Sequence, residues 1–195
     1  MSTENSKTLE EILAELDGLV GFDSVKEKIK KLVAIVNLNE RRKQAGLVTA
    51  EPYFNLVFVG GSKEDRSTVA KLIGKLYRTF GRLSIGEVIE VSREDLVSEY
   101  IGHTAVKTKE FIDKAKGNIL LVNEPYTLMG EFSVGVEALD AILAGIENFG
   151  NDFIVVFSGD IEPMQTFMES NPGLMIRFGV VSTDSFEDSM TAMVF

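Results

Sequence analysis

The chain has 195 residues, enough for one domain with small appendages and a sizeable core. Its net charge of −10 argues against broad electrostatic capture of nucleic acid or of an anionic membrane, so neither is an expected partner. Cysteine is absent and His103 is the only histidine, which excludes disulfides and leaves no metal centre to expect. The first residues lack a basic region followed by an apolar run, so we expect a cytoplasmic protein.

Two amphipathic helices are predicted before the first strand. Apolar residues at helical spacing indicate a short helix from Thr8 to about Leu16 and a second from about Ser24 to Ala45. Glu51-Pro52 then breaks the chain. We expect residues 1–50 to be a helical segment leading into a core of residues 51–183, with a short tail at 184–195.

Short apolar strands alternate with helices through the rest of the chain. The predicted strands are 55–59, 88–91, 118–122 and 153–157. The predicted helices are 67–80, one starting at Ser92, 105–115, 134–146 and 161–170. This alternation favours an α/β fold in which a parallel sheet carries helices on both faces.

Residues 56–68 resemble a strand running into a phosphate-binding loop of the form G-x-x-x-x-G-K-[ST]. Gly60 fits the first glycine, Asp65 the second, Arg66 the lysine and Ser67 the hydroxyl. Arginine is planar and does not replace lysine in a tight loop, and Arg66 is expected to pair with Glu64 or Asp65. The candidate nucleotide-contacting residues are Gly60, Gly61, Arg66, Ser67, Thr68 and Asn123.

The acidic residues of this loop oppose phosphate binding. At about 4 Å and an effective dielectric constant of about 20, each like-charge contact with a polyphosphate is unfavourable by about 4 kcal/mol before screening. Glu64 and Asp65 both carry such a charge. We therefore expect a nucleotide-binding fold that no longer handles nucleotide efficiently.

Four segments in chain order resemble one family. They are Gly18–Lys26, Glu99–Thr108, Glu124–Leu128 and Asn171–Phe178. Together they resemble the CbxX/CfqX branch of the AAA+ ATPases, which includes rubisco-activase-like proteins. The resemblance implies a three-layer αβα P-loop NTPase core, usually followed by a helical lid, and hexameric rings that remodel proteins. The sequence after Arg177 is too short for that lid, so we expect the lid to be largely absent.

The resemblance also implies roles for single residues. The family's Walker B aspartate, which holds the magnesium hydration shell, is replaced by Asn123, so Glu124, the residue that orients water, is expected to be vestigial. Lys63 and Asp65 stand where the family has glycines. Arg177 matches the arginine finger that reaches into a neighbouring subunit.

Two further matches concern the sensor and the substrate. Ser158-Gly159-Asp160 takes the sensor position, where an acid departs from the family pattern. Tyr100-Ile101-Gly102 falls where the family carries the aromatic pore loop that grips a substrate chain. Each match is carried by the family pattern and by nothing else in the sequence.

Three functions remain open. The first is a pseudo-ATPase that needs no cofactor and serves as a scaffold or regulatory subunit, entering a ring beside an active AAA+ relative and donating Arg177 to it. The second is a weak ATPase in which Arg66 and Ser67 hold ATP with magnesium and Glu124 positions water. The third is a monomeric interaction module that uses apolar surface left uncovered by the missing lid. Titration with ATP and magnesium separates the first two, and sedimentation tests the third.

Overall fold

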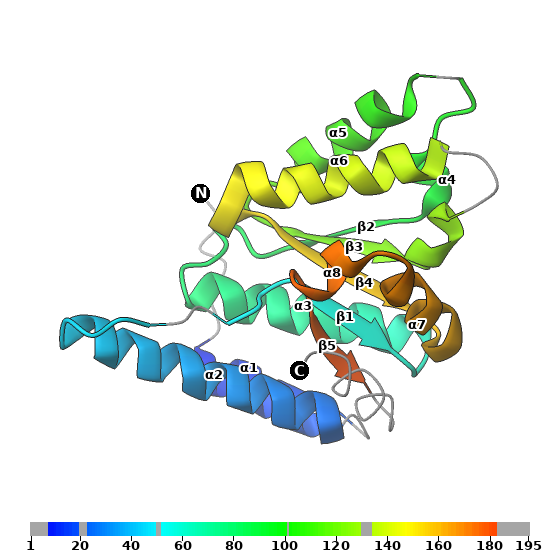
Figure 1. Ribbon diagram of the computed structural model, residues 1–195. Helices are drawn as coiled ribbons and strands as arrows, with labels where there is room; N and C mark the ends of the chain where they lie inside the picture. The colour runs from blue at the N-terminus through cyan, green and yellow to red at the C-terminus, as the bar shows by residue number, and fades with distance from the viewer. Residues whose placement is uncertain (1–7, 20–22, 50–51, 101, 130–133, 183–195) are drawn as a thin grey trace, which may run out of the picture.

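A five-stranded parallel sheet with the strand order β2-β3-β4-β1-β5 forms the centre of the molecule (Figure 1). The computed structural model describes residues 8–19, 23–49, 52–100, 102–129 and 134–182. The strands are β1 (Leu56–Val59), β2 (Val88–Val91), β3 (Ile119–Asn123), β4 (Ile154–Gly159) and β5 (Gly179–Ser182). Because all neighbouring pairs run parallel, the strands' carboxyl ends share one edge of the sheet.

Three helices cover one face of this sheet. They are α1 (Leu9–Gly18), α2 (Asp23–Gln44) and α3 (Lys63–Thr79). Thr8 caps α1 through a capping box with Glu11, which accepts a 2.7 Å hydrogen bond from the Thr8 backbone N–H. The helices bury apolar side chains against alternate residues of β3 and β4, including Leu121 and Val156.

The opposite face carries the remaining helices, so the fold has three layers (Figure 1). These helices are α4 (Arg93–Leu96), α5 (Thr104–Lys114), α6 (Val134–Phe149), α7 (Ile161–Ser170) and α8 (Pro172–Met175), with 3-10 segments at Pro125–Leu128 and Gly150–Asp152. Every residue of β1, β3 and β4 is buried, which explains why those strands read as uninterrupted apolar runs. The predicted αβα architecture is confirmed.

The structure corrects the sequence-based boundaries at three places. Helix α3 begins at Lys63 rather than at Ser67. A fifth strand, β5, pairs with β1, where no strand was predicted. The short helix α8, which ends two residues before Arg177, was not predicted.

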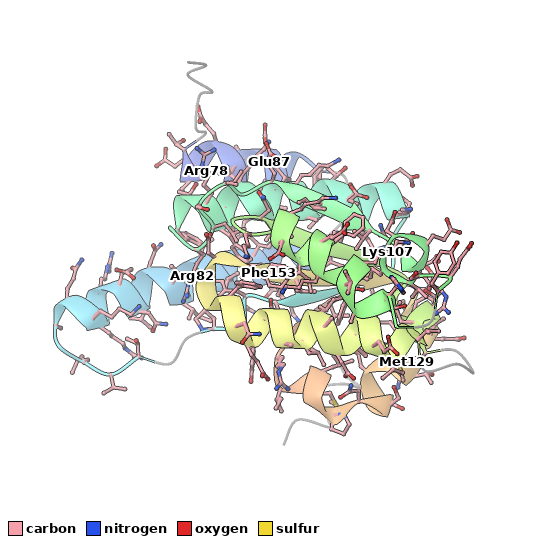
Figure 2. All side chains as sticks on the ribbon, turned by 90° about the horizontal axis from the view of Figure 1, so that it is seen from above. Arg78, Arg82, Glu87, Lys107, Met129 and Phe153 are labelled. Atoms are coloured by element: carbon pink, nitrogen blue, oxygen red, sulfur yellow. The ribbon has the colours of Figure 1, made fainter. Side chains whose placement is uncertain are left out.

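The two ends of the sheet differ in what they carry. Figure 2 shows Arg78 and Arg82 at one end of the molecule and Lys107 and Met129 at the other. Arg78 belongs to the last turn of α3, and Arg82 follows that helix, so the first end is the amino-end edge of the strands.

No helix within the described ranges is both long and apolar enough to cross a membrane.

Candidate functional site

The turn between β1 and α3 consists of two glycines followed by a helix cap. Gly60 and Gly61 have φ values of 80° and 65°, in the left-handed region that favours glycine. Ser62 is the N-cap of α3: its Oγ accepts from the Asp65 N–H at 3.1 Å, and its own N–H donates to the Asp65 carboxylate at 3.3 Å. This capping box draws Lys63 to Arg66 into the helix, so the loop is shorter than the sequence frame suggested.

Arg66 lies inside this turn. The residue is only 7% exposed, although its neighbours Glu64 and Asp65 are exposed. Its Nη1 donates to the carbonyl oxygens of Gly60 and Gly61 at 3.1 and 2.8 Å. Its Nε donates to Ser158 Oγ, at the end of β4, at 2.8 Å. The expectation that Arg66 pairs with Glu64 or Asp65 is therefore wrong, because its side chain turns inward and joins the turn after β1 to β4.

The two hydroxyls predicted beside Arg66 have other partners. Ser67 is buried, and its Oγ donates to the Glu90 carboxylate on β2. Glu90 also lies 3.8 Å from Lys71 Nζ. Thr68 is exposed, and its Oγ1 donates to the Glu64 carbonyl one turn back in α3 at 2.9 Å. Thr68 is therefore engaged within its own helix.

Asn123 ends β3 beside β4, and Glu124 follows it. Asn123 pairs in register with Ser158 and is 6% exposed. Alternation along β3 puts Asn123 on the same face as Leu121, which packs with α3. Glu124 is exposed and adopts φ 51° and ψ 53°, an unusual conformation for a residue with a side chain, and its N–H donates to the Ser158 carbonyl at 2.6 Å.

Acidic groups surround the mouth of the turn. The Asp160 carboxylate lies 3.9 Å from Arg66 Nη1, but its side chain is 71% exposed, which weakens that pair. Burial raises the pKa of the Tyr126 hydroxyl, and the neighbouring Glu124 and Asp160 carboxylates act in the same direction. Within the described ranges, no group of three or more His, Cys, Asp or Glu side chains is arranged to hold a metal ion.

The predicted substrate loop lies away from this turn. Tyr100 is 72% exposed, its ring meets that of His103 edge to face at 6.1 Å, and Gly102 has a φ of 79°. Lys107 braces the loop, because its Nζ donates to the Glu94 and Val97 carbonyls at 2.6 and 2.9 Å. Ile101, predicted to act with Tyr100, lies outside the described residues.

Arg177 follows α8, on the face of the sheet opposite α3. Its side chain is held by contacts within its own chain. Its Nη1 donates to the Gly173 carbonyl at 2.8 Å, and its Nη2 pairs with the Glu147 carboxylate of α6. The guanidinium side chain is 29% exposed and that of Glu147 is 59% exposed. The structure therefore brings together Gly60, Gly61, Arg66 and Ser158 but leaves Tyr100 and Arg177 in separate places.

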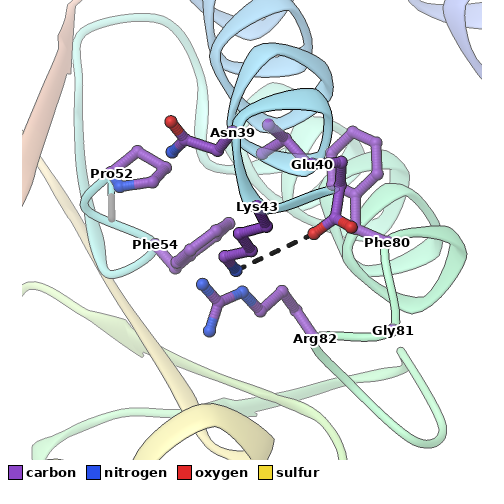
Figure 3. A pocket seen from close by; sticks show the side chains of 9 residues that line it. Asn39, Glu40, Lys43, Pro52, Phe54, Phe80, Gly81 and Arg82 are labelled. Carbon is purple, nitrogen blue, oxygen red and sulfur yellow. Dashed lines mark ion pairs between the residues drawn. The ribbon is translucent and has the colours of Figure 1, made fainter. Parts of the chain in front are cut away.

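A pocket of about 230 Å³ lies at the opposite edge of the sheet, beside the residues that precede β1 (Figure 3). It is lined by α2, by Phe54 and by the turn after α3. The Arg82 guanidinium stacks on the Phe54 ring at 4.0 Å, and Lys43 Nζ lies 3.8 Å from the Glu40 carboxylate on the same helix, α2. None of the predicted site residues lines this pocket.

Sequence comparison finds related proteins over nearly the whole chain. It is 39% identical to stage V sporulation protein K of Bacillus subtilis over 188 residues, covering 95% of this chain and 58% of the relative. It is 37% identical to protein CfxQ of Xanthobacter flavus, covering 86% and 54%. It is 35% identical to the chloroplastic ribulose bisphosphate carboxylase/oxygenase activase of Cyanidioschyzon merolae, covering 91% and 62%.

The chain is a homologue of the CbxX/CfqX-type AAA+ proteins. No family model matches it. The homologue spans less than two thirds of the length of each of these relatives. The predicted family resemblance is confirmed.

Solved structures support the fold alone. The FIGL-1 AAA domain, crystallised in complex with ADP, aligns with a TM-score of 0.52 at 14% identity, covering 93% of this AAA+ homologue and 64% of the other chain. The P216G mutant of Thermotoga maritima RuvB aligns with a TM-score of 0.51 at 20% identity, covering 87% and 48%. Both likenesses agree with the three-layer architecture.

Three residues that hold the predicted site residues or their helix in place were not predicted from sequence. Ser62 caps α3, Glu90 takes the Ser67 hydroxyl, and Glu147 holds Arg177. The Ser62-x-x-Asp65 spacing is a capping-box signal that reveals the first. Glu90 and Glu147 come from distant segments, and no local pattern indicates them.

Proposed function

We propose that this AAA+ homologue is a pseudo-ATPase that acts as a scaffold or regulatory subunit, in a ring beside an active relative. The observation that carries the proposal is the capping box at the start of α3. A phosphate at a helix N-terminus is bound by free backbone N–H groups. Here the Asp65 N–H donates to Ser62 Oγ and the Ser62 N–H to the Asp65 carboxylate. The chain's own side chains therefore use donors that a polyphosphate needs.

Charge at the turn supports the same proposal. Glu64 and Asp65 are exposed in the first turn of α3, and Asp160 and Glu124 are exposed at the ends of β4 and β3. Magnesium favours carboxylate ligands, and Asn123 brings an uncharged amide where the family has an aspartate. These residues do not fit a magnesium-bound triphosphate, so we assign the chain no catalytic step.

Arg177 and Tyr100 support the proposed role in an assembly. The Arg177 side chain is partly exposed, and Tyr100 projects from a braced loop, so both are available to a second protein. Stage V sporulation protein K is a concrete probe for such a partner, since it is a relative over 95% of this chain. In this reading the homologue contributes surfaces and an arginine to an assembly and leaves hydrolysis to its neighbour.

Calorimetric titration tests the proposal. ATP and ADP, each with magnesium, are titrated into the wild-type chain and into a variant combining Lys63→Gly, Asp65→Gly, Arg66→Lys and Asn123→Asp. We expect no binding to the wild type at concentrations where the fourfold variant binds. Micromolar binding by the wild type, with phosphate release abolished by Glu124→Gln, would instead establish a weak ATPase. Sedimentation of the wild type alone and with the relative tests assembly, and a lone monomer under both conditions contradicts the scaffold role.

A further inference from the structure

We infer that the turn between β1 and α3 is a site for a guanidinium group, with Arg66 as its occupant. The inference rests on the proposal that this turn no longer holds nucleotide. Four oxygen atoms face the Arg66 side chain: the carbonyls of Gly60 and Gly61, the Ser158 hydroxyl and, more distantly, the Asp160 carboxylate. Phosphate loops present N–H donors to an anion. This turn presents acceptors to a cation, so its polarity is reversed.

The geometry suits a guanidinium better than an ammonium ion. Nη1 reaches two carbonyl oxygens, at 3.1 and 2.8 Å, while Nε reaches Ser158 Oγ at 2.8 Å. A guanidinium offers five donors in a fixed plane and meets acceptors on two sides at once. A lysine ammonium is a single point of charge and cannot span the same acceptors.

Burial makes this occupant important to the fold. Ser158 is fully buried and Arg66 is 7% exposed. Buried polar groups are unfavourable unless they are hydrogen-bonded, and a buried charge more so. Each partner therefore needs the other, and removing the guanidinium leaves Ser158 and the turn without their donor.

The two acids of the first helical turn fit the same interpretation. A helix N-terminus carries a partial positive charge, so a cation buried beside it is unfavourable. Glu64 and Asp65 occupy the first turn of α3, next to Arg66 in sequence. Their negative charges offset both the helix terminus and the guanidinium. The same charges repel phosphate, so the acids favour one class of ligand over the other.

Truncation and chemical rescue test the inference. Arg66→Ala is compared with Arg78→Ala, which removes an exposed arginine from the far end of the same helix (Figure 2). We expect Arg66→Ala to lower the Tm by about 5–10 °C relative to Arg78→Ala. Methylguanidinium at ten times its Kd should then raise the Tm of Arg66→Ala by about 3–5 °C. Methylammonium at the same concentration should not, and wild type should respond to neither.

Two outcomes would overturn the inference. One is a Tm of Arg66→Ala within about 1 °C of that of Arg78→Ala, a difference that corresponds to less than one hydrogen bond in a chain of this size. The other is equal rescue by methylguanidinium and methylammonium. Neither depends on nucleotide: ATP binding by the wild type would refute the proposed function and leave the rescue result to stand or fall on its own.

A second pair of variants covers the case in which Arg66→Ala does not fold. Arg66→Lys keeps the charge and most of the volume, and Arg78→Lys is its match on the exposed face. We expect the Tm of Arg66→Lys to fall by about 3 °C or more and that of Arg78→Lys to stay unchanged, because only the first loses the planar fork. Equal Tm values for the two lysine variants would contradict the guanidinium site.

Discussion

The Nε atom of Arg66 donates a 2.8 Å hydrogen bond to the hydroxyl of Ser158, which is 92 positions away in the chain. Arg66 belongs to the first turns of α3 and Ser158 to β4, next to β1 in the sheet. The contact joins α3 to β4, the strand beside β1. It lies at the edge of the sheet where the family resemblance implies nucleotide chemistry.

Ser158→Ala should destabilise the protein by about 1–3 kcal/mol, because the buried Arg66 guanidinium loses an acceptor. Urea denaturation of the single variants and of the double variant with Arg66→Ala gives the coupling energy between the two side chains. We expect a coupling of about 0.5–3 kcal/mol, as for residues in direct contact. Strictly additive effects would mean that the hydrogen bond contributes nothing in solution.

Ser62→Ala should destabilise the protein by about 0.5–2 kcal/mol, whereas Ser62→Gly should change its stability by only a few tenths of a kcal/mol. The physical reason is that alanine removes the Oγ that accepts from the Asp65 N–H and also disfavours the N-cap backbone, while glycine leaves the helix end open to water. Midpoints from urea denaturation measure both. Equal destabilisation by the two substitutions would argue against the capping box.

Gly74→Ala should be strongly destabilising, by about 2 kcal/mol or more, although alanine favours helices by about 1 kcal/mol. A Cβ at Gly74 would lie 2.4 Å from the backbone oxygen of Gly86, which cannot move without shifting the chain before β2. Gly18→Ala is the control, since nothing lies within 4 Å of a Cβ there. Thermal melts of both variants decide, and a stabilised Gly74→Ala would contradict the close packing.

Arg177→Ala should leave the fold nearly intact, because the partly exposed pair with Glu147 is worth about 1 kcal/mol or less. In a mixture with stage V sporulation protein K, it should remove any change that the wild-type chain produces in phosphate release. Glu147→Gln should enhance that change, since it loosens the grip on the Arg177 guanidinium. Arg78→Ala is the matched control. An unaltered effect of Arg177→Ala would exclude a role in trans.

The sheet core could be predicted because burial leaves a clear pattern. Residues 119–123 and 154–159 are buried throughout, and an uninterrupted apolar run of that length indicates an interior parallel strand. The order of motifs likewise indicated the family resemblance, which the relatives confirm. Local sequence was sufficient wherever the determining contacts were repeated along one element.

The site could be predicted only in outline. A glycine turn does follow β1, but the early start of α3 depends on the Ser62–Asp65 cap, and a glycine-loop frame hides that signal. The partners of Arg66 and Ser67 come from β4 and β2, and such contacts follow from the sheet order, which no local pattern gives. Strand β5 escaped prediction because only two of its four residues, Val180 and Val181, are apolar.

The positive charge at the Gly60-Gly61 turn belongs to Arg66 of the same chain, so it cannot dissociate as a bound ligand does. In a machine that cycles through nucleotide states, a subunit reports its state by gaining and losing a ligand. A subunit whose ligand is covalently part of itself keeps one geometry through every cycle. In the proposed ring, an active neighbour would therefore contact a surface that stays the same through every cycle.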